Sequence, residues 1–162
     1  MKIISGGQNG VDIAAVRTAK LFKFETGGWL PKGWKTLDGP RPEYSGMYNM
    51  QEHSSPLYPP RTEQNVLDAD LTIRIAKDFN SAGEKCTLNA ILKNKKDWFD
   101  ININQSPRVI SALLDGITTF VWAGLIETIN IAGNSEKTAS GIEKAASNIL
   151  MKFFARIQNL HV

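Results

Sequence analysis

Three glycines, a glutamine and an aspartate are packed into SGGQNGVD, residues 5–12, between an apolar start and a helical pattern. Because a glycine has no side chain, Gly6, Gly7 and Gly10 let the backbone approach a ligand closely. The first N–H groups of the following helix have no partner within the helix and would face the same space. The segment therefore predicts a loop that binds an oxyanion such as a phosphate, and a valine at Gly7 is expected to block it.

The polar side chains of this loop allow more than one interpretation. Gln8 carries both donors and an acceptor, so it can bind the edge of a heterocycle or merely face water. Asp12, at the helix start, can bind a hydroxyl or ring nitrogen of a ligand, or it can simply favour the helix dipole. The pattern is neither GxGxxG nor a P-loop, because no Lys-Ser/Thr pair follows the glycines.

Three further charged residues follow in the next loops. Lys32, in GGWLPKG, can supply a charge for an anion or lie in solvent. Arg61 can hold a phosphate with its planar guanidinium. We expect Thr62 to cap a short helix, and Glu63 then lies in its first turn, where a carboxylate favours the dipole.

The segment SAGEKCT, residues 81–87, resembles a second anion-binding loop. Ser81, Gly83 and Thr87 suit that role, whereas a carboxylate at Glu84 would repel a phosphate. Cys86 lies near the expected helix start, where a thiol can be activated. A lone cysteine more often fills space in a core, and we favour that interpretation.

Composition sets limits on the function. A chain of 162 residues with 42% hydrophobic residues fits one globular domain, 1–162. A net charge of +3 is too small for a dedicated nucleic-acid binder. One cysteine forms no intrachain disulfide, and no segment has the pattern of a signal peptide or membrane span, so we expect a cytoplasmic protein with no membrane partner. His53 and His161 lack partners at ligand spacing, so no metal site and no Ser-His or Cys-His catalytic arrangement are predicted, and the catalytic residues stay unknown.

Alternating strand and helix patterns predict an α/β, Rossmann-like fold, a three-layer parallel sheet with helices on both faces. Loops that follow the strands should gather at one edge, where such sheets bind ligands. These loops are 5–12, 28–39, 78–87 and 132–141. Residues 31–60 hold six of the seven prolines and are expected to form a long loop, which is either a passive excursion or a lid over a ligand.

Four segments together resemble the molybdenum cofactor carrier protein family, which is similar to the Rossmann-like, lysine-decarboxylase-like LOG proteins that bind nucleotide ligands. The segments are ISGGQNGVDIAAV, GGWLPKGWKTLDGP, RTEQNVLDAD and INIAGNSEKTASGIEKA. The resemblance implies a homo-oligomer, a dimer or tetramer, with a pocket for an anionic pterin (the molybdenum cofactor, molybdopterin) or a related nucleotide. The binding residues that it implies are Gly6, Gly7, Gln8, Asn9, Gly10, Asp12, Lys32, Gly33, Arg61, Glu63, Asn65, Ser81, Gly83 and Thr87.

The chain departs from the family pattern at three places. Asn9 stands where the family usually has threonine, and SAGE replaces Ser-Gly-Gly-Thr. AGNSEK replaces AGPRES, so that Ser135 stands in place of an arginine while Glu136 remains. With one arginine fewer and Glu84 added, the pocket should hold less negative charge than the family's.

Three functional interpretations remain. We favour a binding protein that holds an anionic, heterocycle-bearing small molecule without turnover. The first alternative is an enzyme that cleaves N-glycosidic bonds of nucleotides, with acid–base chemistry from Asp12, Glu63 or Glu136. The second is a module that senses or sequesters a nucleotide-derived messenger, with residues 31–60 closing over it.

Overall fold

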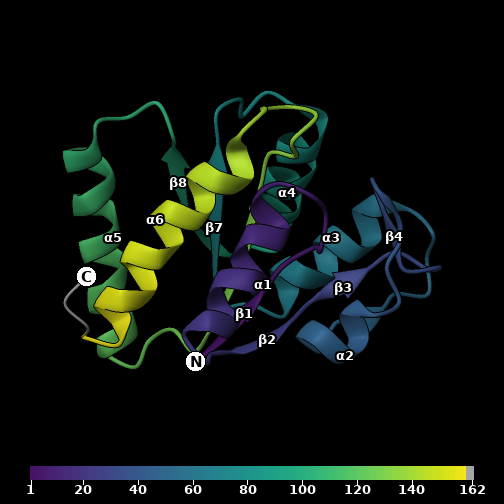
Figure 1. Ribbon diagram of the computed structural model, residues 1–162, viewed down its shortest axis with the longest axis horizontal. Helices are drawn as coiled ribbons and strands as arrows, with labels where there is room; N and C mark the ends of the chain where they lie inside the picture. The colour runs from purple at the N-terminus through teal and green to yellow at the C-terminus, as the bar shows by residue number, and fades with distance from the viewer. Residues whose placement is uncertain (160–162) are drawn as a thin grey trace.

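A five-stranded parallel sheet forms the centre of the protein, as a computed structural model of the chain shows for residues 1–159 (Figure 1). Every pairing in this sheet is parallel. In their order across the sheet the strands are β2 (Glu25–Gly27), β1 (Lys2–Ile4), β9 (Thr128–Gly133), β7 (Leu71–Ala76) and β8 (Asp97–Asn102).

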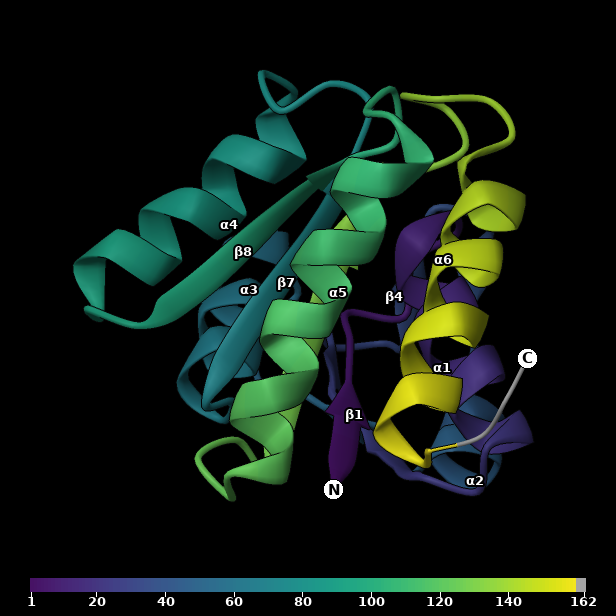
Figure 2. The same ribbon diagram turned by 90° about the vertical axis from the view of Figure 1, so that its left-hand side faces the viewer.

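Helices cover both faces of the sheet (Figure 2). One face carries α1 (Val11–Leu21), α5 (Pro107–Trp122) and α6 (Ile142–Ile157), and the other carries α3 (Tyr58–Leu67) and α4 (Ala82–Lys93). The predicted three-layer α/β fold is confirmed. No described helix is long and apolar enough to cross a membrane.

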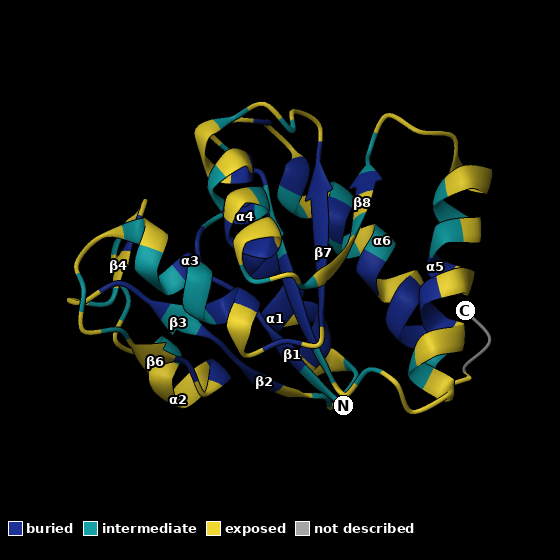
Figure 3. Ribbon diagram, turned by 180° about the vertical axis from the view of Figure 1, so that it is seen from behind, coloured by how far each residue is buried: buried dark blue, intermediate teal, exposed yellow. Residues whose placement is uncertain are grey.

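The two faces of the central strands differ in chemistry because successive side chains of a strand point in opposite directions. On β7 and β9 the residues Ile73, Ile129 and Ile131 are fully buried and belong to the main core with α1, α5 and α6. The alternate positions hold Thr72, Arg74 and Asn130, all buried and all polar. Figure 3 shows the buried strands behind α3 and α4. A buried polar face needs partners other than a hydrocarbon core.

The start of α5 agrees with its sequence signals. Ser106 is the N-cap, its Oγ accepts a hydrogen bond from the N–H of Val109, and Pro107 occupies the first helical position. Serine is a preferred N-cap residue and proline a preferred first helical residue, so both favour a helix that begins here.

Before α3 begins at Tyr58, residues 31–57 hold only short elements. They are β4 (Lys35–Thr36) and β5 (Gly39–Pro40), which form a hairpin, α2 (Tyr44–Tyr48) and β6 (Gln51–Glu52), which pairs with β3 (Trp29–Leu30).

The predicted helix start at Thr62 is wrong. Helix α3 begins at Tyr58, with Pro59 in its first turn, and Leu57 is its N-cap without a side-chain hydrogen bond. Thr62 lies inside the helix, and its hydroxyl donates to the carbonyl of Tyr58 at 3.1 Å. The N–H groups in the first turn of a helix have no partner within the helix, so proline, which lacks an N–H, is well tolerated there. Pro59 was expected to favour a loop, but it lies in the first turn of α3.

Candidate functional site

A cavity of about 400 Å³ lies on the polar side of the sheet, at the carboxyl ends of the strands. It is lined by the first glycine loop, α3, the start of α4 and the segment that follows β9. Only Leu37 comes from the segment 28–39. The volume is in the range of small-molecule sites, which is roughly 300–1,000 Å³.

The structure brings together eight of the fourteen residues singled out from the sequence. The eight that line the cavity are Gly6, Gln8, Asp12, Arg61, Asn65, Ser81, Gly83 and Thr87. The other six lie outside its lining: Gly7, Asn9, Gly10, Lys32, Gly33 and Glu63.

Gly6 lies directly beneath the guanidinium of Arg61. An added Cβ at Gly6 would lie 1.6 Å from Nη1 of Arg61 and 2.6 Å from Oδ2 of Asp12. Nη1 of Arg61 is 3.8 Å from Oδ2 of Asp12, and both side chains are about nine-tenths buried. Burial raises the pKa of Asp12 to about 6, although Arg61 and the N–H of Gln8 act to lower it. Because a Cβ at residue 6 would clash with the guanidinium, the glycine at this position is what lets Arg61 lie against the loop.

Gly10 and Asn134 join the first loop to the loop after β7. Gly10 has φ +85°, and a Cβ there would lie 2.4 Å from the carbonyl oxygen of Asn134, so only glycine fits. The Asn134 side chain accepts from the N–H groups of Lys77 and Asp78, both at 2.9 Å, and donates to the carbonyl of Asp78. Asn134 thus fixes one wall of the cavity from a buried position.

Gln8 and Asn9 fasten the first loop to the hairpin of the long segment. The Gln8 amide donates to the carbonyl of Lys35 at 3.2 Å and accepts from the N–H of Leu37 at 3.0 Å. Asn9 donates to the carboxylate of Asp38 at 3.0 Å. The Gln8 side chain therefore binds the β4–β5 hairpin. This differs from both roles considered from the sequence, which were binding a heterocycle and facing water.

Gly7 faces away from the cavity. A Cβ at Gly7 would meet Sδ of Met50 at 3.0 Å and Cδ1 of Leu30 at 3.2 Å. These two residues form a small core with Ile13, Val16 and Tyr48. A valine at Gly7 would therefore disturb that core, and Gly6 is the position at which a side chain would enter the site.

An arginine and one carboxylate, Arg74 and Glu84, are buried behind the start of α4, and the exposed Asp100 lies beside Arg74. Arg74 donates twice to Asp100, at 2.8 and 2.6 Å, and once to the backbone carbonyl of Glu84 at 3.1 Å. The Glu84 carboxyl lies 3.7 Å from Nη1 of Arg74 and is almost fully buried. Burial raises the pKa of Glu84 to about 7, against the lowering effect of Arg74.

The amino-terminal turn of α4 provides donors. Ser81 is the N-cap, and its Oγ accepts from the N–H of Glu84 at 3.4 Å. The N–H groups of Ala82 and Gly83, which line the cavity, have no acceptor among the described residues. Such groups, at the positive end of a helix dipole, favour an anion.

Unpaired polar atoms gather at this cavity. Within residues 1–159, four buried side-chain N or O atoms lack a hydrogen-bond partner. Three of them belong to residues that line the cavity: Nε of Arg61, Oε2 of Glu84 and Oδ1 of Asn130. Because an unpaired buried polar atom is costly, this concentration points to a polar partner that is bound there.

The other proposed acid–base residues have structural partners. Glu63 accepts from Lys93 at 2.7 Å and from Asn94 at 3.1 Å, and these hydrogen bonds lower the pKa of Glu63. Glu136 accepts from the N–H groups of Gly141 at 2.8 Å and Glu143 at 2.7 Å, so it caps α6. Lys32 is exposed, and Gly33 donates its N–H to the Glu52 carboxylate.

Sequence reasoning missed Asn130, Asn134 and Arg74. For Arg74 and Asn130 the available signal was alternation with isoleucine in LTIRIA and TINIAG, since a polar residue at every second position of a buried strand marks a polar layer. Asn134 follows the second of these segments and carried no such signal. No group of three or more His, Cys, Asp or Glu side chains in the described part of the chain could hold a metal ion.

Comparisons with known proteins agree with this architecture. The crystal structure of a "Putative molybdenum carrier protein" from Syntrophus aciditrophicus SB matches with a TM-score of 0.84 and 34% sequence identity, over 94% of this chain and 93% of that chain. A comparison with curated protein sequences gave no significant match. The model of the circularly permutated YpsA SLOG family matches residues 3–154. The chain therefore belongs to the circularly permutated YpsA SLOG family.

Proposed function

We propose that the protein is a binding protein that holds an anionic, heterocycle-bearing small molecule in this cavity and does not turn it over. The observation that carries the proposal is Arg61. Its guanidinium is buried beside the cavity, its nearest carboxylate oxygen is 3.8 Å away, and its Nε has no partner among the described residues. A buried cation with an incomplete set of partners is a strong site for an oxyanion.

The cavity residues fit a phosphorylated pterin such as the molybdenum cofactor. Arg61 and the free N–H groups of Ala82 and Gly83 would hold the phosphate, and Asn130 and Glu84 would face the ring. The similar protein from Syntrophus aciditrophicus SB is named a molybdenum carrier, which supports this ligand class. A bound cofactor would bring its molybdenum and dithiolene chemistry, whereas these residues only bind, orient and bury it.

Native mass spectrometry tests the proposal directly. The protein would be offered the molybdenum cofactor, molybdate, nucleoside mono- and triphosphates and ADP-ribose in competition. We expect one cofactor or nucleotide per subunit and no product masses, and the same spectra would report the proposed homodimer or homotetramer. Binding of molybdate alone, or of nothing, would contradict the proposal.

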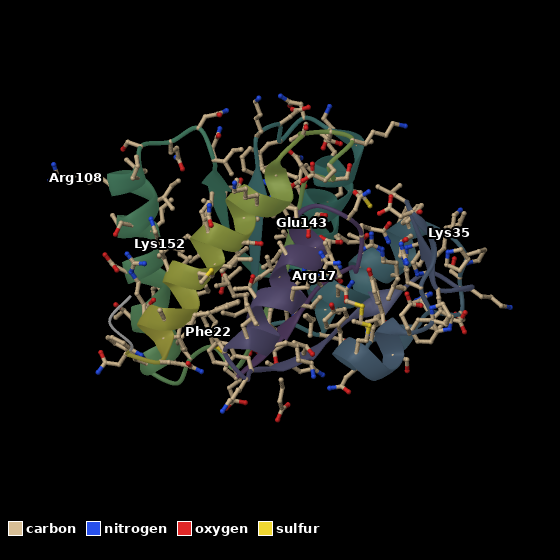
Figure 4. The ribbon with its side chains drawn as sticks, in the orientation of Figure 1. Arg17, Phe22, Lys35, Arg108, Glu143 and Lys152 are labelled. Carbon is tan, nitrogen blue, oxygen red and sulfur yellow. The ribbon has the colours of Figure 1, made fainter. Side chains whose placement is uncertain are left out.

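A matched pair of variants locates the site. Arg61→Ala should abolish retention of the ligand. Arg108→Ala removes an exposed arginine at the start of α5 and should leave retention of the ligand unchanged. Figure 4 shows Arg108 at the opposite end of the molecule from Lys35. Equal loss in both variants would indicate non-specific charge attraction.

A nucleotide hydrolase is the second candidate, and Asp12 is the observation that favours it. Asp12 is the only one of the three proposed acid–base residues that lines the described cavity, and its pKa of about 6 suits proton transfer near neutral pH. Release of a free base from a nucleoside monophosphate by the wild type, abolished in Asp12→Asn, would establish this activity and refute the carrier.

A further inference from the structure

Three residues that line the cavity carry acceptor oxygens that have no donor among the described residues. Oε2 of Glu84 and Oδ1 of Asn130 are both buried and unpartnered among the described residues. Asp12 uses Oδ2 to accept from the N–H of Gln8 at 3.3 Å, and its Oδ1 has no donor in the described part of the chain. Because acceptors repel the oxygens of a phosphate, these atoms require a different part of the ligand.

Arg74 leaves the Glu84 carboxylate incompletely satisfied. Its Nε and Nη2 donate to Asp100, and its Nη1 donates to the backbone oxygen of Glu84. The distance of 3.7 Å from Nη1 to Oε2 of Glu84 is too long for a hydrogen bond. The protein thus provides a cation nearby but no donor to Oε2 of a side chain that is 1% exposed.

An ionised carboxylate accepts hydrogen bonds and cannot donate them. Its two oxygens match two parallel N–H donors, as in the pairing of arginine with a carboxylate. In a heterocycle the same donor pair is a ring N–H beside an exocyclic amino group. Adenine does not offer it, because the ring nitrogen beside its amino group is an acceptor.

We propose that Glu84, with Asn130 beside the same cavity, selects ligands with a 2-amino-4-oxopyrimidine ring, as in a pterin or guanine, by accepting hydrogen bonds from the ring N–H and the 2-amino group. Glu84 is thus a specificity-determining residue. The inference rests on the proposed function, since it assumes that this cavity is where the ligand binds. Arg61 and the start of α4 attract the anionic end, and Glu84 distinguishes the ring.

Isothermal titration of the wild type with GMP and IMP, at a pH well above the Glu84 pKa of about 7 so that its carboxyl is ionised, tests the inference without a variant. The two nucleotides carry the same phosphate and differ by the 2-amino group alone. Loss of one hydrogen bond to a charged group should weaken IMP about 10- to 100-fold relative to GMP, and AMP should bind no better than IMP. Equal affinities for GMP and IMP would overturn the inference and leave the anion-binding proposal intact.

Glu84→Gln should bring the affinity for GMP close to that for IMP. Glu127→Gln is the matched control, because Glu127 is exposed beside the other end of β9 and should keep the full GMP preference. Retention of the molybdenum cofactor provides a second measurement, with thermal unfolding to show that both variants fold. Equal retention by wild type and Glu84→Gln would overturn the inference alone, whereas failure of the cofactor and both nucleotides to bind the wild type would overturn the proposed function as well.

Discussion

A methyl group at Gly6 is expected to disable the cavity while leaving the fold in place. In Gly6→Ala the new Cβ would lie 1.6 Å from Nη1 of Arg61 and 2.6 Å from its Cζ. Non-bonded heavy atoms prefer separations of about 3.5 Å or more, so the guanidinium must retreat by about 2 Å. That movement separates Arg61 from Asp12, now 3.8 Å away, and from an anion in the cavity.

The expected loss is that of one hydrogen bond to a charged group, about 1.5–3 kcal/mol, or about 10- to 100-fold in Kd for GMP. The fold should survive because the clash is with the end of a flexible side chain and because Gly6 does not have a positive φ. We expect the free energy of unfolding to change by less than about 2 kcal/mol.

Titration of Gly6→Ala, Arg61→Ala and the double variant with GMP provides the assay. Because both substitutions remove the same group from the cavity, the double variant should bind no more weakly than Arg61→Ala alone. Gly116→Ala, in the exposed middle of α5 where a Cβ meets nothing within 4 Å, should stabilise the protein by about 1 kcal/mol and leave the Kd unchanged. A folded Gly6→Ala with wild-type affinity, or additive losses in the double variant, would refute the placement of Arg61 at the ligand.

Four further outcomes can be measured. The folded-state pKa values of Asp12 (about 6) and Glu84 (about 7) lie above their ordinary values of 3.8 and 4.5, so the folded protein binds more protons than the unfolded chain. As the pH rises from about 4 to 6 for Asp12, and to 7 for Glu84, the free energy of unfolding should fall by up to about 1.4 kcal/mol per pH unit and per carboxyl. Urea unfolding across this range checks the sign, and Glu84→Gln should flatten the slope. Asn134→Ala should cost about 2–4 kcal/mol and speed amide exchange at Lys77 and Asp78. Glu136→Ala should lower stability by about 0.5–2 kcal/mol through its lost cap on α6, with no change in GMP affinity. Ser135→Arg, at the cavity edge, should favour GTP over GMP, with an advantage that fades as salt is raised; equal gains for both nucleotides would contradict it.

The sheet and its helices could be predicted because each rests on a local signal. Residues 71–76 alternate as a strand should, and Ser106 with Pro107 marks the start of α5. The start of α3 could not be placed by the same means, since its cap is Leu57, a residue type without a capping side chain. The prolines of this region favour a loop when the sequence is taken alone, although a first helical turn accepts them equally well.

The site was harder to predict than the fold because the partners of each polar side chain come from distant segments. Gln8 binds residues 27 and 29 positions further along the chain. The backbone carbonyl of Glu84 accepts a hydrogen bond from Arg74 of β7. Arg61, which lies against Gly6, comes from the helix that begins at Tyr58. The position of Arg61 on α3 places Gly6 beside the cavity, whereas Leu30 and Met50, from other segments, place Gly7 beside a small core.

The departures from the family pattern gain a common physical explanation in this geometry. Arg74 lies behind Glu84 and compensates part of its charge, and Oε2 of Glu84 has no donor among the described residues. Ser135, in place of an arginine, removes a cation from the rim of the cavity. A site with fewer cations and more acceptors loses affinity for additional phosphates and gains it for N–H groups. Under the proposed function, we therefore expect these substitutions to make the ring, more than the charge, the part of the ligand that this chain distinguishes.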